Sequence, residues 1–100
     1  MNEQKLAGML GLAVRARQAA AGMEACRILA KSGKCGVILT DAEAAPGTRE
    51  KAEETARQAG TQSGVLPPGM IMKATGKDNM VIAIREGSFS EQIISILSGL

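Results

Sequence analysis

The sequence predicts a three-layer α/β/α sandwich with a mixed sheet. Segments with helical periodicity alternate along the chain with short apolar runs, as in a sheet that is covered by helices. Two of these runs, KCGVILT at residues 34–40 and MVIAIR at residues 80–85, are apolar enough to be covered on both faces, so we expect them at the centre of the sheet. One hundred residues suffice for a single domain, residues 1–100, with its own core.

The first half of the chain predicts two helices and a central strand. Residues 2–15 carry apolar side chains at helical spacing. A second helix is expected from Gly22 to residue 32, and Gly33 would end it as a C-terminal glycine cap. The strand at residues 34–40 then runs into DAEAAPG, which has the composition of a turn.

The second half predicts a surface helix, a weaker strand and two further helices around the second buried strand. Residues 48–59 have a thin stripe of alanines and many charges, and Gly60 would stop this helix. Residues 61–66 form the weaker strand, and Pro68 can open a short helix that Gly76 ends. After residues 80–85, Phe89, Ile93, Ile94 and Leu97 mark the apolar face of a closing helix.

Composition narrows the classes of function. The chain has one aromatic residue, Phe89, and no histidine. Modules that bind single-stranded nucleic acid by stacking need aromatic side chains on their surface, so a stacking RNA-recognition or cold-shock fold is disfavoured. Histidine is the commonest general base and zinc ligand, so its absence disfavours hydrolases and most zinc sites. We expect no enzyme activity, no metal and no cofactor.

Several features indicate a cytoplasmic protein without a membrane segment. Cys26 and Cys35 lack a CxxC spacing and are expected to be buried thiols in a reducing compartment. Residues 1–21 imitate a secretion signal, but Arg15 and Arg17 interrupt it and its apolar run has helical spacing. No apolar run reaches transmembrane length.

The charges are distributed unevenly. Residues 1–35 hold six basic and two acidic side chains, whereas residues 36–60 hold three basic and five acidic ones. A basic end beside an acidic flank is typical of a protein that offers one face to nucleic acid. Scattered solvated charge on a small domain explains the composition equally well. The first interpretation predicts positive potential around Arg15, Arg17, Arg27, Lys31 and Lys73, and an acidic side formed by residues 48–59.

Four motifs carry a resemblance that covers nearly the whole chain. They are LGLAVRARQ at residues 10–18, SGKCGVIL at 32–39, DAEAAPGT at 41–48 and MKATGKDNMVIAI at 72–84. Together with the order of the elements they resemble the kink-turn-binding ribosomal protein family, and most of all its small bacterial members. The resemblance implies a short additional strand at residues 18–21, and hence a mixed four-stranded sheet in the α/β/α sandwich.

The resemblance also implies where RNA would lie. In such proteins RNA crosses the loop before the second helix, the first turns of that helix, and the loop that contains Pro67 here. A helix N-terminus offers free N–H groups and partial positive charge to phosphate, a glycine admits a close approach, and basic side chains neutralise phosphates. The RNA-binding residues expected from the resemblance and the charges are Arg15, Arg17, Gly22, Met23, Glu24, Arg27, Lys31, Pro67 and Lys73.

The chain departs from the family at the base-reading positions. RNA-binding members place Asn, Glu and Lys two, three and six positions after the glycine, where this sequence has Glu24, Ala25 and Ile28. A slip of one residue would set Met23, Glu24 and Arg27 against that trio, but it needs a deletion inside the helix.

Each selected residue also has a structural explanation. A tight turn alone can account for Gly22, and Glu24 can stabilise a helix N-terminus. Met23 can be a core residue, and Lys73 can be a solvated charge.

Three functions were weighed. The first is a monomeric protein that binds structured RNA, such as a kink-turn or ribosomal RNA, and not DNA. The second is a protein-interaction module that kept the fold and lost kink-turn specificity. The third is an enzyme with its site at Asp41, where open α/β sheets often bind ligands. No nucleophile and base pair or metal cluster accompanies Asp41, so the third is disfavoured.

Overall fold

The structure is a computed structural model that describes residues 2–99. The described residues form five helices and four strands. The helices are α1 (Glu3–Arg15), α2 (Met23–Lys31), α3 (Pro46–Gln58), α4 (Met70–Thr75) and α5 (Ser88–Leu97), and the strands are β1 (Ala19–Ala21), β2 (Cys35–Asp41), β3 (Gln62–Leu66) and β4 (Val81–Arg85).

The strands form one mixed sheet in the order β1-β4-β2-β3 within the described residues. β4 runs antiparallel to both β1 and β2, and β2 and β3 are parallel. The two strands predicted to be central, β2 and β4, do lie at the centre, and their residues are almost entirely buried. The predicted mixed four-stranded sheet is therefore confirmed.

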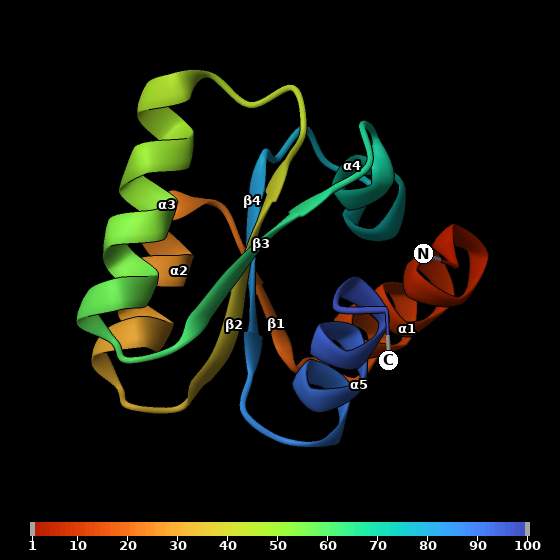
Figure 1. Cartoon of the computed structure of the whole chain (residues 1–100), viewed down its shortest axis with the longest axis horizontal. Coiled ribbons are helices and arrows are strands. Elements are labelled where there is room, and N and C mark those ends of the chain that lie inside the picture. Colours follow the sequence, from red (N-terminus) through yellow and green to blue (C-terminus); the bar gives the residue numbers. More distant parts are fainter. Residues whose placement is uncertain (1, 100) are drawn as a thin grey trace.

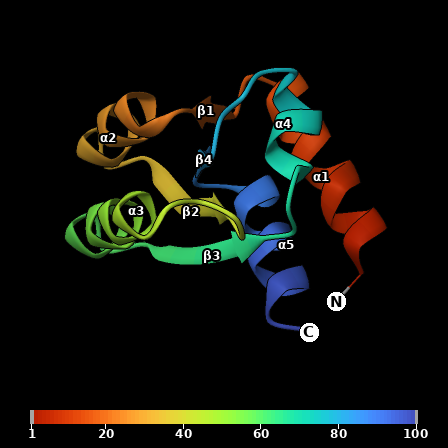
Figure 2. The ribbon, with the colours of Figure 1, turned by 90° about the horizontal axis from the view of Figure 1, so that it is seen from above.

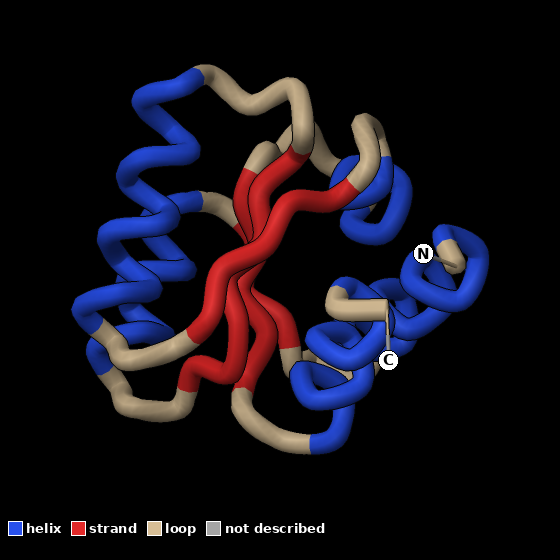
Figure 3. The backbone as a smooth tube through the Cα atoms, viewed as in Figure 1, coloured by secondary structure: helices blue, strands red, loops and turns tan. Residues whose placement is uncertain are grey.

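Helices cover both faces of this sheet, which confirms the α/β/α sandwich (Figure 1). α2 and α3 lie on one side, and α1, α4 and α5 lie on the other, as the view from above also shows (Figure 2). Figure 3 shows the strands as a twisted layer between the two groups of helices. Each side has its own buried cluster, so the sheet separates two cores.

The two cores differ in side-chain size. Leucine and isoleucine side chains dominate the core under α1, α4 and α5, including Leu10, Ile71 and Ile93. Alanine and cysteine from α2 and α3, such as Cys26 and Ala52, make up most of the helical side of the other core. The predicted thin alanine stripe of residues 48–59 is thus the buried face of α3.

Two helix starts differ from the predicted ones, and proline and glycine explain both. α3 begins at Pro46 rather than at residue 48, because proline fits the first helical turn, where an N–H is not needed. The short α4 begins at Met70 and not at Pro68. Gly69 has a left-handed backbone with φ of 80° and so lies before the helix.

Candidate nucleic-acid interface

The start of α2 lies at the end of the sheet where β1, β2 and β3 finish. Gly22 is the N-cap of α2, and no side chain caps the helix among the described residues. Its N–H donates to the carbonyl of Val81 at 2.9 Å, which holds the start of α2 against β4. The free N–H groups of the first turn therefore face this end of the sheet.

The backbone at position 22 requires glycine. Its φ of 95° and ψ of 151° fall in a region that other residues essentially avoid. A Cβ atom there would also lie 3.4 Å from Oδ1 of Asn79, in the loop before β4. The turn alone thus explains this glycine, and its presence is not by itself an argument for RNA.

Asp41 joins two loops at the same end of the sheet. Its carboxylate is buried and accepts hydrogen bonds from the N–H of Glu43 at 2.7 Å and the N–H of Gly69 at 2.9 Å. These bonds hold the loop that contains Pro67 against the loop after β2. Asp41, which the sequence suggested only as the site of the disfavoured enzyme, thus has a structural role that the sequence analysis did not predict. A short acidic residue directly before a turn, which can bond the N–H two residues on, was the available signal.

Four predicted site residues share this end of the molecule. Gly22, Met23 and Glu24 lie at the start of α2, and Pro67 follows β3. Met23 is half-buried against the core under α2 and α3, so packing accounts for it. The Glu24 side chain is 81% exposed, and one of its oxygens lies 3.9 Å from a guanidinium nitrogen of Arg27. An exposed pair at that distance contributes little to stability.

Arg15 and Lys73 lie together in a groove between α1 and α4. The groove has a volume of about 370 Å³, and its lining is Ala7, Gly8, Gly11, Arg15, Met70, Lys73 and Ala74. Apart from their chain neighbours and the backbone of α1 itself, no described atom lies within 4 Å of where a Cβ of Gly8 or Gly11 would be. Small residues and open space therefore line the groove together with one cation from α1 and one from α4.

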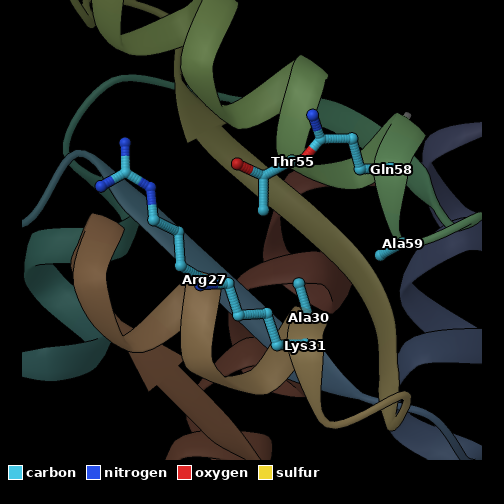
Figure 4. Close-up of a pocket in the computed structure, with 6 residues that line it drawn as sticks. All are labelled: Arg27, Ala30, Lys31, Thr55, Gln58 and Ala59. Atoms are coloured by element: carbon cyan, nitrogen blue, oxygen red, sulfur yellow. The ribbon is translucent and has the colours of Figure 1, made fainter.

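Arg27 and Lys31 occupy a different groove, between α2 and α3 (Figure 4). Its volume is about 400 Å³, and Thr55, Gln58 and Ala59 form the wall on α3. Arg27 also lines the adjoining hollow with Glu50 and Glu54. These two bases therefore lie beside α3, on the other side of the sheet from Arg15 and Lys73. The acidic side predicted for residues 48–59 is wrong, because the three glutamates of this helix are matched by three basic side chains.

Arg17 follows Arg15 by two residues, just after the end of α1, and lines neither groove. It has a left-handed conformation with φ of 59°, the only such residue besides glycines among residues 2–99. The length of β1 separates it from Gly22. The prediction that the five bases gather in one place is therefore wrong, because Arg15 and Lys73 lie on the other side of the sheet from Arg27 and Lys31.

The end of the sheet at Gly22 is not itself basic. Glu24, Glu43 and Asp78 are exposed in the segments that meet there, beside Lys77. Negative charge at this end opposes the approach of phosphate. The cations that can attract a phosphate backbone lie instead in the α1–α4 and α2–α3 grooves.

Cys26 and Cys35 are free thiols. Burial raises the pKa of Cys26 to about 12, so its thiolate is scarce near neutral pH. Within residues 2–99 no group of three or more His, Cys, Asp or Glu side chains is placed to hold a metal. None of the described helices is long and apolar enough to cross a membrane.

Two solved structures have the same fold as this chain. A protein of unknown function from Bacillus halodurans matches with a TM-score of 0.86 at 25% identity, covering 94% of this chain and 97% of that one. The Giardia lamblia 15.5kD RNA binding protein matches with a TM-score of 0.72 at 11% identity, covering 96% and 87%. No protein-family model matches the sequence, and no curated protein matches it.

Proposed function

We propose that this chain is an RNA-binding protein of the kink-turn-binding ribosomal type, with the RNA backbone in the α1–α4 groove and the adjoining start of α2 beside it. The observation that carries the proposal is one groove lined by Arg15 of α1 and Lys73 of α4 together with Gly8 and Gly11. Glycine inside a helix costs about 1 kcal/mol relative to alanine. Here it keeps space open for a phosphodiester between two cations.

The fold supports the same proposal, since it is shared with an RNA-binding protein from Giardia lamblia. The replaced trio at Glu24, Ala25 and Ile28 limits what the protein can read. Phosphate contacts give affinity without sequence, and contacts to base edges give specificity. We therefore expect weak binding to structured RNA, including kink-turn or ribosomal RNA, with a small preference for the kink-turn. The protein acts as a cytoplasmic binding protein without catalysis, consistent with its free thiols and the engaged carboxylate of Asp41.

One observation favours the second candidate, a protein-interaction module. Ile28, at a position where RNA-binding relatives carry lysine, is 63% exposed on α2. A large apolar side chain on the surface suits contact with protein better than contact with phosphate. The two candidates therefore make different predictions for the same set of RNAs.

The first experiment compares two pairs of cations on the two sides of the sheet. Arg15→Gln with Lys73→Gln should weaken binding to a kink-turn and to a plain duplex alike, and should reduce the salt slope by about two units, one per lost cation. The matched pair Arg27→Gln with Lys31→Gln removes the same charge from the α2–α3 groove and should have the smaller effect. Filter binding at several salt concentrations measures both.

The outcomes separate the candidates. A larger loss from the Arg27 and Lys31 pair would move the site to the α2–α3 groove and contradict the proposed placement. Wild-type protein that binds neither RNA would overturn RNA binding and favour the interaction module.

The second experiment restores the family's base-reading residues. Glu24→Asn, Ala25→Glu and Ile28→Lys change positions that are exposed or half-buried, so the fold should tolerate them. Each recovered contact should raise the preference for a kink-turn over a duplex by about 1 to 3 kcal/mol at most. A folded triple variant with an unchanged preference would show that the start of α2 does not contact the bases.

A further inference from the structure

β3 forms one edge of the sheet, and its outer side is open within the described residues. Its five residues, QSGVL, include neither a charge nor a proline. Proteins usually protect an edge strand with lysine, proline, a bulge or a covering segment, because its free N–H and C=O groups can pair with another strand. The other edge, β1, is only three alanines long. β3 is therefore the edge of this sheet that is suited to a further strand.

The free backbone groups of β3 belong to Ser63 and Val65. The carbonyl of Leu66 accepts from the N–H of Ala42, on the side of β2, at 2.9 Å. Thr40 Oγ1 donates to the carbonyl of Gly64 on that same side. Because backbone groups alternate in direction along a strand, those of Ser63 and Val65 point outward. Both residues are exposed, Val65 by 44%.

Hollows flank this edge on both faces of the sheet. On the face of α5, Gly64 lies under Leu97, whose Cδ1 would be 2.9 Å from a Cβ at position 64. The hollow there measures about 310 Å³ and is bounded by Ile94, Leu97 and Ser98. Side chains of an added strand would enter hollows on alternate faces, which is how strand addition gains specificity.

The hollow on the face of α3 is bordered by an arginine that has a buried donor unpaired within residues 2–99. It measures about 100 Å³ and adjoins Ser63, Val65, Arg49 and Glu53. One guanidinium nitrogen of Arg49, Nη2, donates to the carbonyl of Ala42 at 2.9 Å. Its Nε is buried with no hydrogen-bond partner among the described residues. Buried donors are nearly always paired, so the contacts within one copy leave this arginine incompletely satisfied beside β3.

We propose that β3 pairs with β3 of a second copy of this chain, antiparallel and centred on Gly64. In this register Ser63 lies opposite Val65 of the second copy, and the outward groups of both residues form four hydrogen bonds around the two-fold axis. Glycine faces glycine at the centre, which leaves room for the two Leu97 side chains to pack over it. The Ser63 side chain of the second copy lies on the same face of the sheet as Arg49.

The second copy is the occupant because this edge is complementary to itself. An uncharged strand meets an identical uncharged strand, and the same two residues point outward on both. The proposed dimer differs from the monomer expected from the sequence. The sequence alone does not show that β3 lies at an open edge, because that depends on the order of the strands in the sheet. The pairing does not use the proposed RNA site, because the lining of the α1–α4 groove includes no residue of β3.

Sedimentation at increasing protein concentration tests the proposal. Wild type should form dimers within the micromolar range, up to about 200 µM, the affinity range of small interfaces. Val65→Lys should weaken self-association at least about tenfold, because the edge then carries a charge at each copy. The control Leu12→Lys changes a similarly exposed apolar residue on α1 and should leave dimers intact. A monomer throughout this range, or a dimer that Val65→Lys leaves unchanged, overturns the proposal.

A cross-link tests the register separately. With Cys35→Ser as background, Ser63→Cys combined with Val65→Cys should give disulfide-linked dimers under mild oxidation. Hydrogen-bonded pairs place Cα atoms about 5.5 Å apart, within the range of a disulfide. Either cysteine alone should give no disulfide-linked dimer, because the same position in the two copies is then offset by two residues along the paired strands. Equal cross-linking by the single variants would overturn the register, and wild-type RNA binding in the cross-linked dimer would show that the two proposals stand independently.

Discussion

The two helical layers cover the same sheet with very different side chains. The layer of α1, α4 and α5 inserts Leu6, Leu10 and Ile93, all fully buried. The layer of α2 and α3 inserts mainly alanine and Cys26. A buried leucine contributes about 2 kcal/mol more than an exposed one, and alanine far less. The first layer therefore provides most of the stability. The second layer buries smaller side chains and contributes less to the free energy of unfolding.

Removing a large side chain from the first layer should have the largest effect. Leu10→Ala deletes a fully buried side chain and leaves a cavity under the sheet, so it should lower the free energy of unfolding by about 2 to 5 kcal/mol. The control Leu12→Ala, on the same helix at a side chain that is 46% exposed, should change it by about 0.5 kcal/mol or less. Urea denaturation measures both. Equal losses of free energy in the two variants would show that burial of large side chains does not account for the stability of this layer.

High pH should loosen the second layer first. Burial raises the pKa of Cys26 from 9.0 to about 12, so the folded state holds this proton more tightly than the unfolded state. The stabilisation is complete below pH 9 and is lost as the pH rises towards 12. The free energy of unfolding of wild type should therefore fall faster between pH 9 and 11 than that of Cys26→Ala. Parallel slopes would show that the Cys26 thiol ionises as freely in the folded protein as in the unfolded one.

The smallest effect concerns how one helix of each layer ends. After α1 the N–H of Gln18 bonds to Ala13 at 2.9 Å, and after α3 the N–H of Thr61 bonds to Ala56 at 2.9 Å, the same closing geometry. The left-handed residue is Arg17 in the first case and Gly60 in the second. Arg17→Gly should raise the free energy of unfolding by about 1 kcal/mol, because glycine adopts this backbone without strain.

The reverse substitution serves as the control for this pair. Gly60→Arg places an arginine in the same geometry on the other layer and should lower the free energy of unfolding by a similar amount. Thermal unfolding of the two variants side by side measures the difference. A stabilising Gly60→Arg would show that the backbone geometry does not determine the preference at these helix ends.

The sequence predicted those parts of the fold in which local pattern and tertiary burial agree. β2 and β4 are apolar runs, and burial on both faces requires such runs. β1 is three alanines with no strand preference of their own, and it exists because it pairs with β4. A resemblance to known proteins was therefore needed to expect it.

The candidate site was less predictable because it depends on distances between elements. Arg15 and Lys73 are far apart in the sequence and meet only through the packing of α1 on α4. Arg27 and Lys31 are four residues apart on α2 and so share one face of it, but whether that face meets α3 or solvent depends on where α3 lies. The role of Asp41 likewise depends on the loop that carries Gly69.

The packing of α1 against α5 has a consequence for synthesis of the protein on the ribosome. Leu10 leaves the ribosome well before Ile93, which lies in the same core. The larger core therefore cannot close until α5 has emerged, and contacts between such distant segments form slowly. The segment from α2 to β3 is contiguous in sequence and emerges earlier. During translation the thinner layer is thus the first that can assemble, and the apolar face of α1 stays uncovered until α5 arrives.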